Sequence, residues 1–77
     1  MRTDHIQLAF PPGGIEKVRD YFVGVWGMIE DERHLSIDRS EGAWFRKDYC
    51  IIHVGFDPNF IPQKKAHPAI IVDYIAN

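Results

Sequence analysis

Three of the four histidines of this chain stand where their imidazoles could do chemistry together. His5 and His67 each open a segment of similar pattern, D-H-I-Q-L-A-F at residues 4–10 and H-P-A-I-I-V-D at residues 67–73, and His53 lies in an apolar run between them. Equivalent residues of successive repeats face a shared surface, and imidazole is a common ligand of divalent metals. We therefore expect that His5, His53 and His67 could converge on one metal ion.

The first half of the chain has the pattern of a strand, a helix and a second strand. Residues 5–10 alternate between apolar and polar side chains, as a half-buried strand does, and P-P-G-G at residues 11–14 ends this strand. Apolar residues then recur at helical spacing over residues 15–26, and Gly27 stands where a left-handed helix cap is expected. The charged residues 28–35 are assigned to a partly exposed second strand.

The second half has the pattern of a hairpin followed by one more strand. Residues 43–46 and 49–56 are predicted to pair as antiparallel strands around a turn at residues 47–48. A loop with two prolines at residues 57–63 leads to a last strand at residues 67–72. The expected fold is therefore α+β, a strand, a helix and three strands, with a second unit beginning at about residue 65. A ferredoxin-like sandwich is disfavoured because that fold needs a second helix before the last strand.

Strand alternation indicates which way the histidines face. One face of the three better strands carries an aliphatic set, which should cover the helix because an apolar helix stripe needs an apolar partner. Its members are Ile6, Leu8 and Phe10, then Cys50, Ile52, Val54 and Phe56, then Ile70 and Val72. The three histidines fall on the opposite face with Gln7, Tyr49 and Ile51. A sheet with a helix on one side and polar groups on the other forms a cup, whose concave side is the expected ligand site.

Size and composition exclude several classes of protein. The chain has 77 residues, enough for one small domain, and its 45% hydrophobic content is well above the disordered range. Its 9 basic and 11 acidic residues give no electrostatic footprint for nucleic acid or an anionic membrane. No signal peptide or membrane span is recognisable, so we expect a cytoplasmic protein. Cys50 lies in an apolar run and is expected to be a buried, inert thiol.

Several other side chains have both a functional and a structural interpretation. Trp44, Phe45 and Tyr49 could line an apolar ligand pocket, whereas the structural interpretation places at least one residue of each adjacent pair in the core. Arg46 and the lysines at residues 64–65 could attract an anionic substrate, although short basic runs usually face solvent. The structural interpretation is favoured for both groups.

At these residues the chain resembles the vicinal oxygen chelate superfamily, which includes glyoxalases, bleomycin-resistance proteins, fosfomycin-resistance enzymes and extradiol dioxygenases. The resemblance rests on D-H-I-Q-L-A-F-P-P-G-G, F-V-G-V-W-G-M, G-A-W-F-R, I-I-H-V-G and K-A-H-P-A-I-I-V-D. It covers one βαβββ unit and the first strand of the next. In this family two such units pair into a cup, and metal ligands come from the first strand of each unit and from fourth strands. The resemblance therefore implies ligands at His5 and His67.

Two features depart from the family pattern. The fourth-strand ligand is usually a carboxylate, but the corresponding positions read Ile51-Ile52-His53, so that His53 would have to substitute. The acidic run at residues 30–32 is interpreted as a solvated strand face and offers no convincing base. The second unit is also short, and we therefore expect a homodimer in which two copies complete the cup, with exchange of the final strand as one form of it.

Two functions of different class remain open at this point. The first is a non-catalytic, glyoxalase-like or bleomycin-resistance-like protein that binds a small hydrophobic molecule, with the histidines as polar lining. The second is a metal-dependent lyase, isomerase or dioxygenase that holds zinc, nickel, manganese or iron through His5 and His67. The missing carboxylate and the short second unit favour the first. A degenerate family member without activity, assembled only by dimerisation, is a third possibility.

Overall fold

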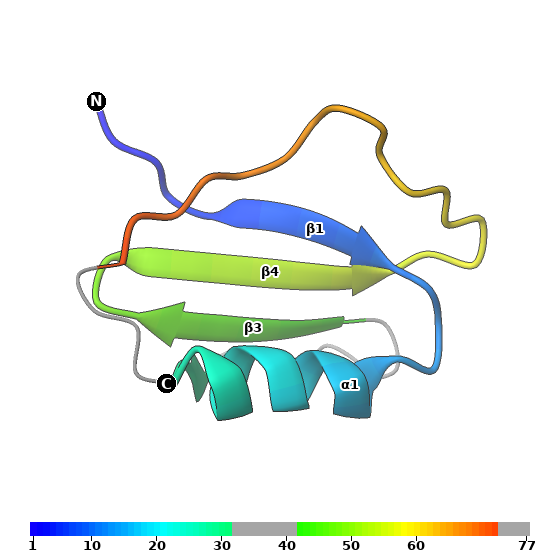
Figure 1. The fold of residues 1–77 in the computed structure, drawn as a ribbon, viewed down its shortest axis with the longest axis horizontal. Coiled ribbons are helices and arrows are strands. Elements are labelled where there is room, and N and C mark those ends of the chain that lie inside the picture. Colours follow the sequence, from blue (N-terminus) through cyan, green and yellow to red (C-terminus); the bar gives the residue numbers. More distant parts are fainter. Residues whose placement is uncertain (32–41, 73–77) are drawn as a thin grey trace.

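A four-stranded mixed sheet with one helical segment on one face makes up the fold (Figure 1). The computed structural model describes residues 1–31 and 42–72. The elements follow the order β1 (Ile6–Phe10), α1 (Ile15–Arg19), η1 (Asp20–Val25), β2 (Ile29–Glu30), β3 (Gly42–Lys47) and β4 (Cys50–Phe56). In the sheet the strand order is β1-β4-β3-β2, with β1 parallel to β4 and the other pairs antiparallel. This arrangement is the predicted α+β half-cup.

The core lies between the sheet and the helical segment, as the strand alternation predicts. Phe45, Ile52 and Val54 are fully buried at 0% exposure, and the ring of Phe22 from the helix stacks on Phe45 with centroids 5.2 Å apart. Ile6, Leu8, Phe10, Cys50 and Phe56 are partly buried against this cluster. The aliphatic face of β1 and β4 therefore covers the helix, and the opposite face of the sheet carries the polar side chains.

The helix predicted over residues 15–26 is present, but its second half is wider than an α-helix. After α1 the backbone continues as the π-helix η1, in which the amide of Trp26 donates to the carbonyl of Tyr21 at 3.1 Å. Gly27 has φ 72°, the left-handed conformation expected of a helix cap, and the amide of Met28 donates to the carbonyl of Phe22 at 2.9 Å. Lys47 Nζ donates to the Trp26 carbonyl at 3.2 Å, which places a positive charge at the negative end of the helix.

The hairpin is also present, with its turn one residue later than predicted. Lys47 pairs with Cys50, so the turn consists of Asp48 and Tyr49, and Asp48 has φ 54°. Tyr49, expected in a strand, is therefore a turn residue, and it is 96% exposed. β2, at Ile29–Glu30, covers part of the second strand predicted over residues 28–35, and residues 32–35 lie outside the described residues.

The last predicted strand is not formed. The structure describes residues 66–72, and none of them belongs to a hydrogen-bonded strand. This segment runs back past β1 (Figure 1), and Ile70 is partly buried against the core, whereas Val72 is 45% exposed and Ile71 94% exposed. A strand is stable only when its amides and carbonyls pair with a neighbour, and no described strand of this chain pairs with this segment. The alternation of residues 67–72 is thus a strand pattern without a partner.

No helix within the described ranges is long and apolar enough to cross a membrane.

Candidate functional site

Residues of β1, β4 and β3 form rows across the face of the sheet that is opposite the helix, which we call the open face. Gln7 of β1 pairs with His53 of β4, and His53 pairs with Trp44 of β3, so these three side chains form one row. The next row consists of Ala9, Gly55 and Gly42. The open face therefore combines a row of large polar and aromatic groups with an adjacent row of small residues.

Two histidines and one tryptophan meet on the open face. The imidazole of His53 stacks on the indole of Trp44, with ring centroids 4.1 Å apart and planes 9° apart. The ring of His5 meets Trp44 edge-on at 5.0 Å and lies 6.2 Å from the ring of His53. Trp44 and His53 are partly buried, and the side chain of His5 is 35% exposed. The structure thus brings His5 and His53 together beside an aromatic surface.

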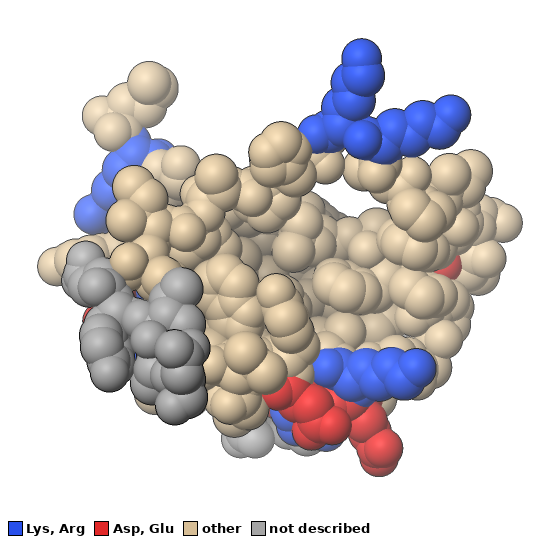
Figure 2. All heavy atoms as spheres, viewed as in Figure 1, with Lys and Arg blue, Asp and Glu red and all other residues tan. Residues whose placement is uncertain are grey.

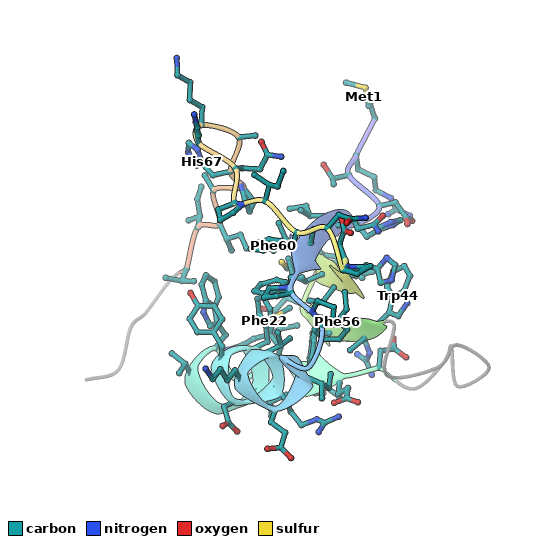
Figure 3. The ribbon with its side chains drawn as sticks, turned by 90° about the vertical axis from the view of Figure 1, so that its right-hand side faces the viewer. Met1, Phe22, Trp44, Phe56, Phe60 and His67 are labelled. Atoms are coloured by element: carbon teal, nitrogen blue, oxygen red, sulfur yellow. The ribbon has the colours of Figure 1, made fainter. Side chains whose placement is uncertain are left out.

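The third histidine lies elsewhere in the chain. His67 is exposed, and Figure 3 places it on the other side of the sheet from Trp44. Its Nδ1 lies 2.7 Å from the carbonyl oxygen of Lys65. Sequence alternation placed His67 beside His5 and His53 on the assumption that residues 67–72 join the sheet. Since that strand is not formed, one copy of the chain does not bring the three imidazoles together.

The donor set on the open face fits part of a metal site. Two imidazoles bound to one tetrahedral zinc have ring centroids about 5 Å apart, because the Zn–N bond is about 2.0–2.1 Å. The His5 and His53 ring centroids are 6.2 Å apart, wider than this spacing, so the two rings would have to move closer to share one ion. Over residues 1–31 and 42–72, however, no group of three His, Cys, Asp or Glu side chains is placed to hold an ion. A complete site needs a further ligand.

The acidic run at residues 30–32 differs from its interpretation as a solvated strand face at the two positions that are described. Glu30, 19% exposed, accepts a hydrogen bond of 2.6 Å from Arg19 Nε on the helix side, which raises the pKa of Arg19. The Asp31 amide donates to the Trp44 carbonyl at 2.7 Å, so Asp31 continues the row of Trp44 on the open face. Its side chain is only 6% exposed, and Arg46 Nε lies 3.4 Å from its Oδ2.

Asp31 is therefore the residue of this face that the sequence did not reveal. Its burial depends on the pairing of β2 with β3, where Ile29 lies opposite Arg46 and Glu30 opposite Phe45. A short strand of two residues has too little alternation to show this pairing in advance. The acidic run is evident in the sequence, but its two described carboxylates lie on opposite faces of the sheet.

The remaining predicted site residues have different positions. Ile51 is partly buried on the open face, and Gln7 is exposed there, with its amide nitrogen 3.3 Å from where a Cβ at Gly55 would lie. Tyr49 is at the hairpin tip, away from the row of Trp44. The lysines at residues 64–65 are exposed in the segment after β4. Gln7 and Ile51 thus belong to the same face as Trp44, whereas Tyr49 lies in the turn at the end of the β3–β4 hairpin.

The comparisons with known proteins bear on this arrangement. No family model matches the chain, and no curated protein matches it. Among solved structures, it is similar to the crystal structure of a Bacillus anthracis protein assigned to the glyoxalase family, with 34% sequence identity and a TM-score of 0.82. The chain has a glyoxalase-type fold. The resemblance to vicinal oxygen chelate proteins is thereby confirmed for the fold.

The match also shows how much of the solved protein this chain corresponds to. It covers 95% of this chain and 61% of the Bacillus anthracis chain, so the present chain spans less than two thirds of that protein.

Proposed function

We propose that the open face of this glyoxalase-type unit binds a small molecule with a flat, apolar portion. The observation that carries this proposal is the stack of His53 on Trp44, with ring centroids 4.1 Å apart, beside His5. Stacked aromatic rings with a polar edge offer a ligand both an apolar surface and hydrogen-bonding groups. The protein is then a small-molecule binding protein of the glyoxalase or bleomycin-resistance type.

The accessible part of the neighbouring row, at Ala9 and Gly55, is where such a ligand would rest. Ala9 and Gly55 have no side chain beyond a methyl group, and a flat group resting on these two residues would adjoin the His53 ring. Gly42, the third residue of the row, is buried, with Nε2 of His53 3.5 Å from where a Cβ there would lie. The Gln7 amide borders this row at Gly55 and can donate or accept a hydrogen bond. Arg46, 50% exposed and held by Asp31, supplies a positive charge on the same face.

A second copy of the chain completes the cup in this proposal. β1 is an edge strand, because the sheet order ends with it. Several large hydrophobic side chains are exposed, among them Val25 at 75%, Ile61 at 79% and Ile71 at 94%. Exposed strand edges and apolar patches of this kind favour association. Residues 67–72, which have a strand pattern but pair with no strand in the described part of the chain, would gain a partner from the second copy.

Metal-dependent catalysis is the second candidate, favoured by the approach of His5 to His53 at 6.2 Å. A divalent ion held there would act as a Lewis acid on an oxygen-rich substrate. His67 of the partner subunit would supply the third ligand if the final segments are exchanged. This chain's own residues would contribute His5 and His53 as donors, Trp44 to exclude water, and Arg46 to attract an anionic substrate.

The ligand-binding proposal is tested by chemical-shift mapping with a set of planar aromatic fragments. We expect the shifts to concentrate on the amides of β1, β3 and β4, and Trp44→Ala to weaken binding about tenfold, equivalent to about 1.4 kcal/mol. Tyr49→Ala, which removes an aromatic ring at the exposed turn, is the matched control and should leave binding unchanged. Shifts confined to the helix face, or equal binding by the Trp44→Ala protein, would contradict the proposal.

The metal candidate needs a separate measurement. Native mass spectrometry in the presence of zinc, nickel, manganese or ferrous ion should show stoichiometric uptake by the wild-type protein and its loss in His5→Ala. Uptake that is the same in both proteins would contradict ligation by His5.

A further inference from the structure

We infer that Asp4 is a positioning residue that fixes the tautomer of His5, so that Nε2 of His5 is the unprotonated nitrogen and can serve as a ligand. This inference deepens the metal-binding form of the proposed function and rests on it for its biological role. The observation itself is a contact within the chain, since His5 Nδ1 lies 2.8 Å from Asp4 Oδ2.

The chemistry of the partner decides which nitrogen carries the proton. Asp4 is 93% exposed, and an exposed carboxylate is ionised at neutral pH, so that it can only accept a hydrogen bond. At 2.8 Å the Nδ1 of His5 must therefore be the donor. In the neutral imidazole the proton then resides on Nδ1, and Nε2 has a free lone pair for a metal or for a ligand donor.

His67 shows the same arrangement with a different partner. Its Nδ1 lies 2.7 Å from the Lys65 carbonyl oxygen, which also can only accept a hydrogen bond. The two histidines that open the repeated segments thus both hold Nδ1 in a local hydrogen bond and leave Nε2 outside it. Histidines that bind metals have this arrangement, in which a second group orients the ring through the nitrogen that is not coordinated.

The difference between the two partners makes the inference testable. A side chain orients His5, whereas the backbone orients His67. Removing the carboxylate of Asp4 should therefore change the tautomer of His5 and leave that of His67 unchanged. Because Asp4 is 93% exposed, its substitution does not disturb the core.

The experiment is long-range ¹H–¹⁵N NMR of the imidazole nitrogens in metal-free protein at about pH 8.5, well above the ordinary pKa of histidine. In the wild type, His5 and His67 should both show the Nδ1–H form. In Asp4→Ala the signals of His5 should change to the Nε2–H form that predominates for free imidazole side chains, while His67 keeps its pattern as the internal control. Asp4→Asn retains an oxygen acceptor and should preserve the wild-type pattern at His5.

Zinc titration of the same three proteins gives the second readout. We expect Asp4→Ala to bind zinc about tenfold more weakly than the wild type, and Asp4→Asn to retain most of the affinity. An Nε2–H form of His5 in the wild type, or the same tautomer in wild type and Asp4→Ala, would overturn the inference. So would a His5 signal that changes equally in Asp4→Asn and Asp4→Ala. Failure of the wild type to bind zinc would instead overturn the metal-binding function, because the tautomer is read without metal.

Discussion

At the residue scale, Cys50 is a partly buried thiol on the core side of β4. Burial raises the pKa of the Cys50 thiol, because desolvation disfavours the thiolate. The folded protein then keeps the thiol proton at a pH where the unfolded chain has lost it, so this group's contribution to stability declines as the pH rises above the unfolded pKa.

We therefore expect Cys50 to react slowly with iodoacetamide. The rate at about pH 8.5 should be lower in the native protein than in protein unfolded by urea, and the native rate should rise at a higher pH than the unfolded rate. Equal rates in the two states, with the same pH dependence, would show that the thiol is not desolvated. Cys50→Ser serves as the blank for reaction at other side chains.

Two glycines that face each other across β3 and β4 offer a second test at this scale. A Cβ at Gly42 would lie 2.5 Å from the backbone oxygen of Val54, whereas a Cβ at Gly55 would meet only the amide nitrogen of the Gln7 side chain at 3.3 Å. Gly42→Ala should therefore lower the free energy of unfolding by about 1–3 kcal/mol, since the strands must separate. Gly55→Ala should change it by less than about 0.5 kcal/mol.

Urea unfolding of both variants measures this difference. Similar stabilities for Gly42→Ala and Gly55→Ala would mean that β3 and β4 do not approach as closely as described. Gly55→Ala has a further use, because its methyl group occupies the row of small residues. If a flat ligand rests there, this variant should bind it more weakly while remaining folded.

At the scale of elements, alanine substitution of two glycines, one within the helical segment and one at its end, should have opposite effects on stability. Gly27 has φ 72°, whereas Gly24 lies within η1 and a Cβ there would meet nothing within 4 Å. Gly24→Ala should stabilise the protein by up to about 1 kcal/mol, because alanine loses less backbone entropy in a helix. Gly27→Ala should destabilise it by about 1–2 kcal/mol, because alanine is strained in the left-handed region.

Thermal unfolding of the two variants, followed by circular dichroism, separates these effects. The melting temperature should rise for Gly24→Ala and fall for Gly27→Ala. A shift in the same direction for both would contradict the assignment of Gly27 as the residue that ends the helix.

The elements also show which structural features the sequence patterns predicted correctly and which they did not. Long alternation in β1 and β4, and helical spacing over residues 15–26, predicted the core and the open face because each pattern repeats several times. The turn was displaced by one residue at Asp48, where a non-glycine residue has positive φ. The strand over residues 67–72 was wrong for this chain because its pattern is local, whereas strand formation depends on a distant partner. Asp31 was misread for the same reason.

At the scale of the whole molecule, charge and apolar surface are unevenly distributed. Figure 2 shows the face that carries the helix and the segment after β4, with charged side chains at its margins and a broad uncharged area between them. Val23 and Val25 of the helical segment, together with Ile71 and Val72, are among the exposed hydrophobic residues. In a chain of this size such a surface is a reason to expect self-association.

If the protein forms a dimer with a metal site shared between its subunits, a mixture of two variants can test this, whereas neither variant alone can. If each site combines His5 of one copy with His67 of the partner subunit, a symmetric dimer has two such sites. His5→Ala and His67→Ala should each abolish stoichiometric zinc uptake. When the two variants are mixed and allowed to exchange, about half of the dimers are mixed, and each mixed dimer retains one intact site of two.

The mixture should therefore bind about one quarter of the zinc that the wild type binds, although neither variant binds any alone. A site built within one chain predicts no recovery, because every chain in the mixture lacks one histidine. Lack of recovery in a mixture that native mass spectrometry shows to contain mixed dimers would thus exclude the shared site. Recovery would explain why His67 lies apart from His5 and His53 in a single copy, since exchange of residues 67–72 would give that segment its strand partner and the site its third imidazole.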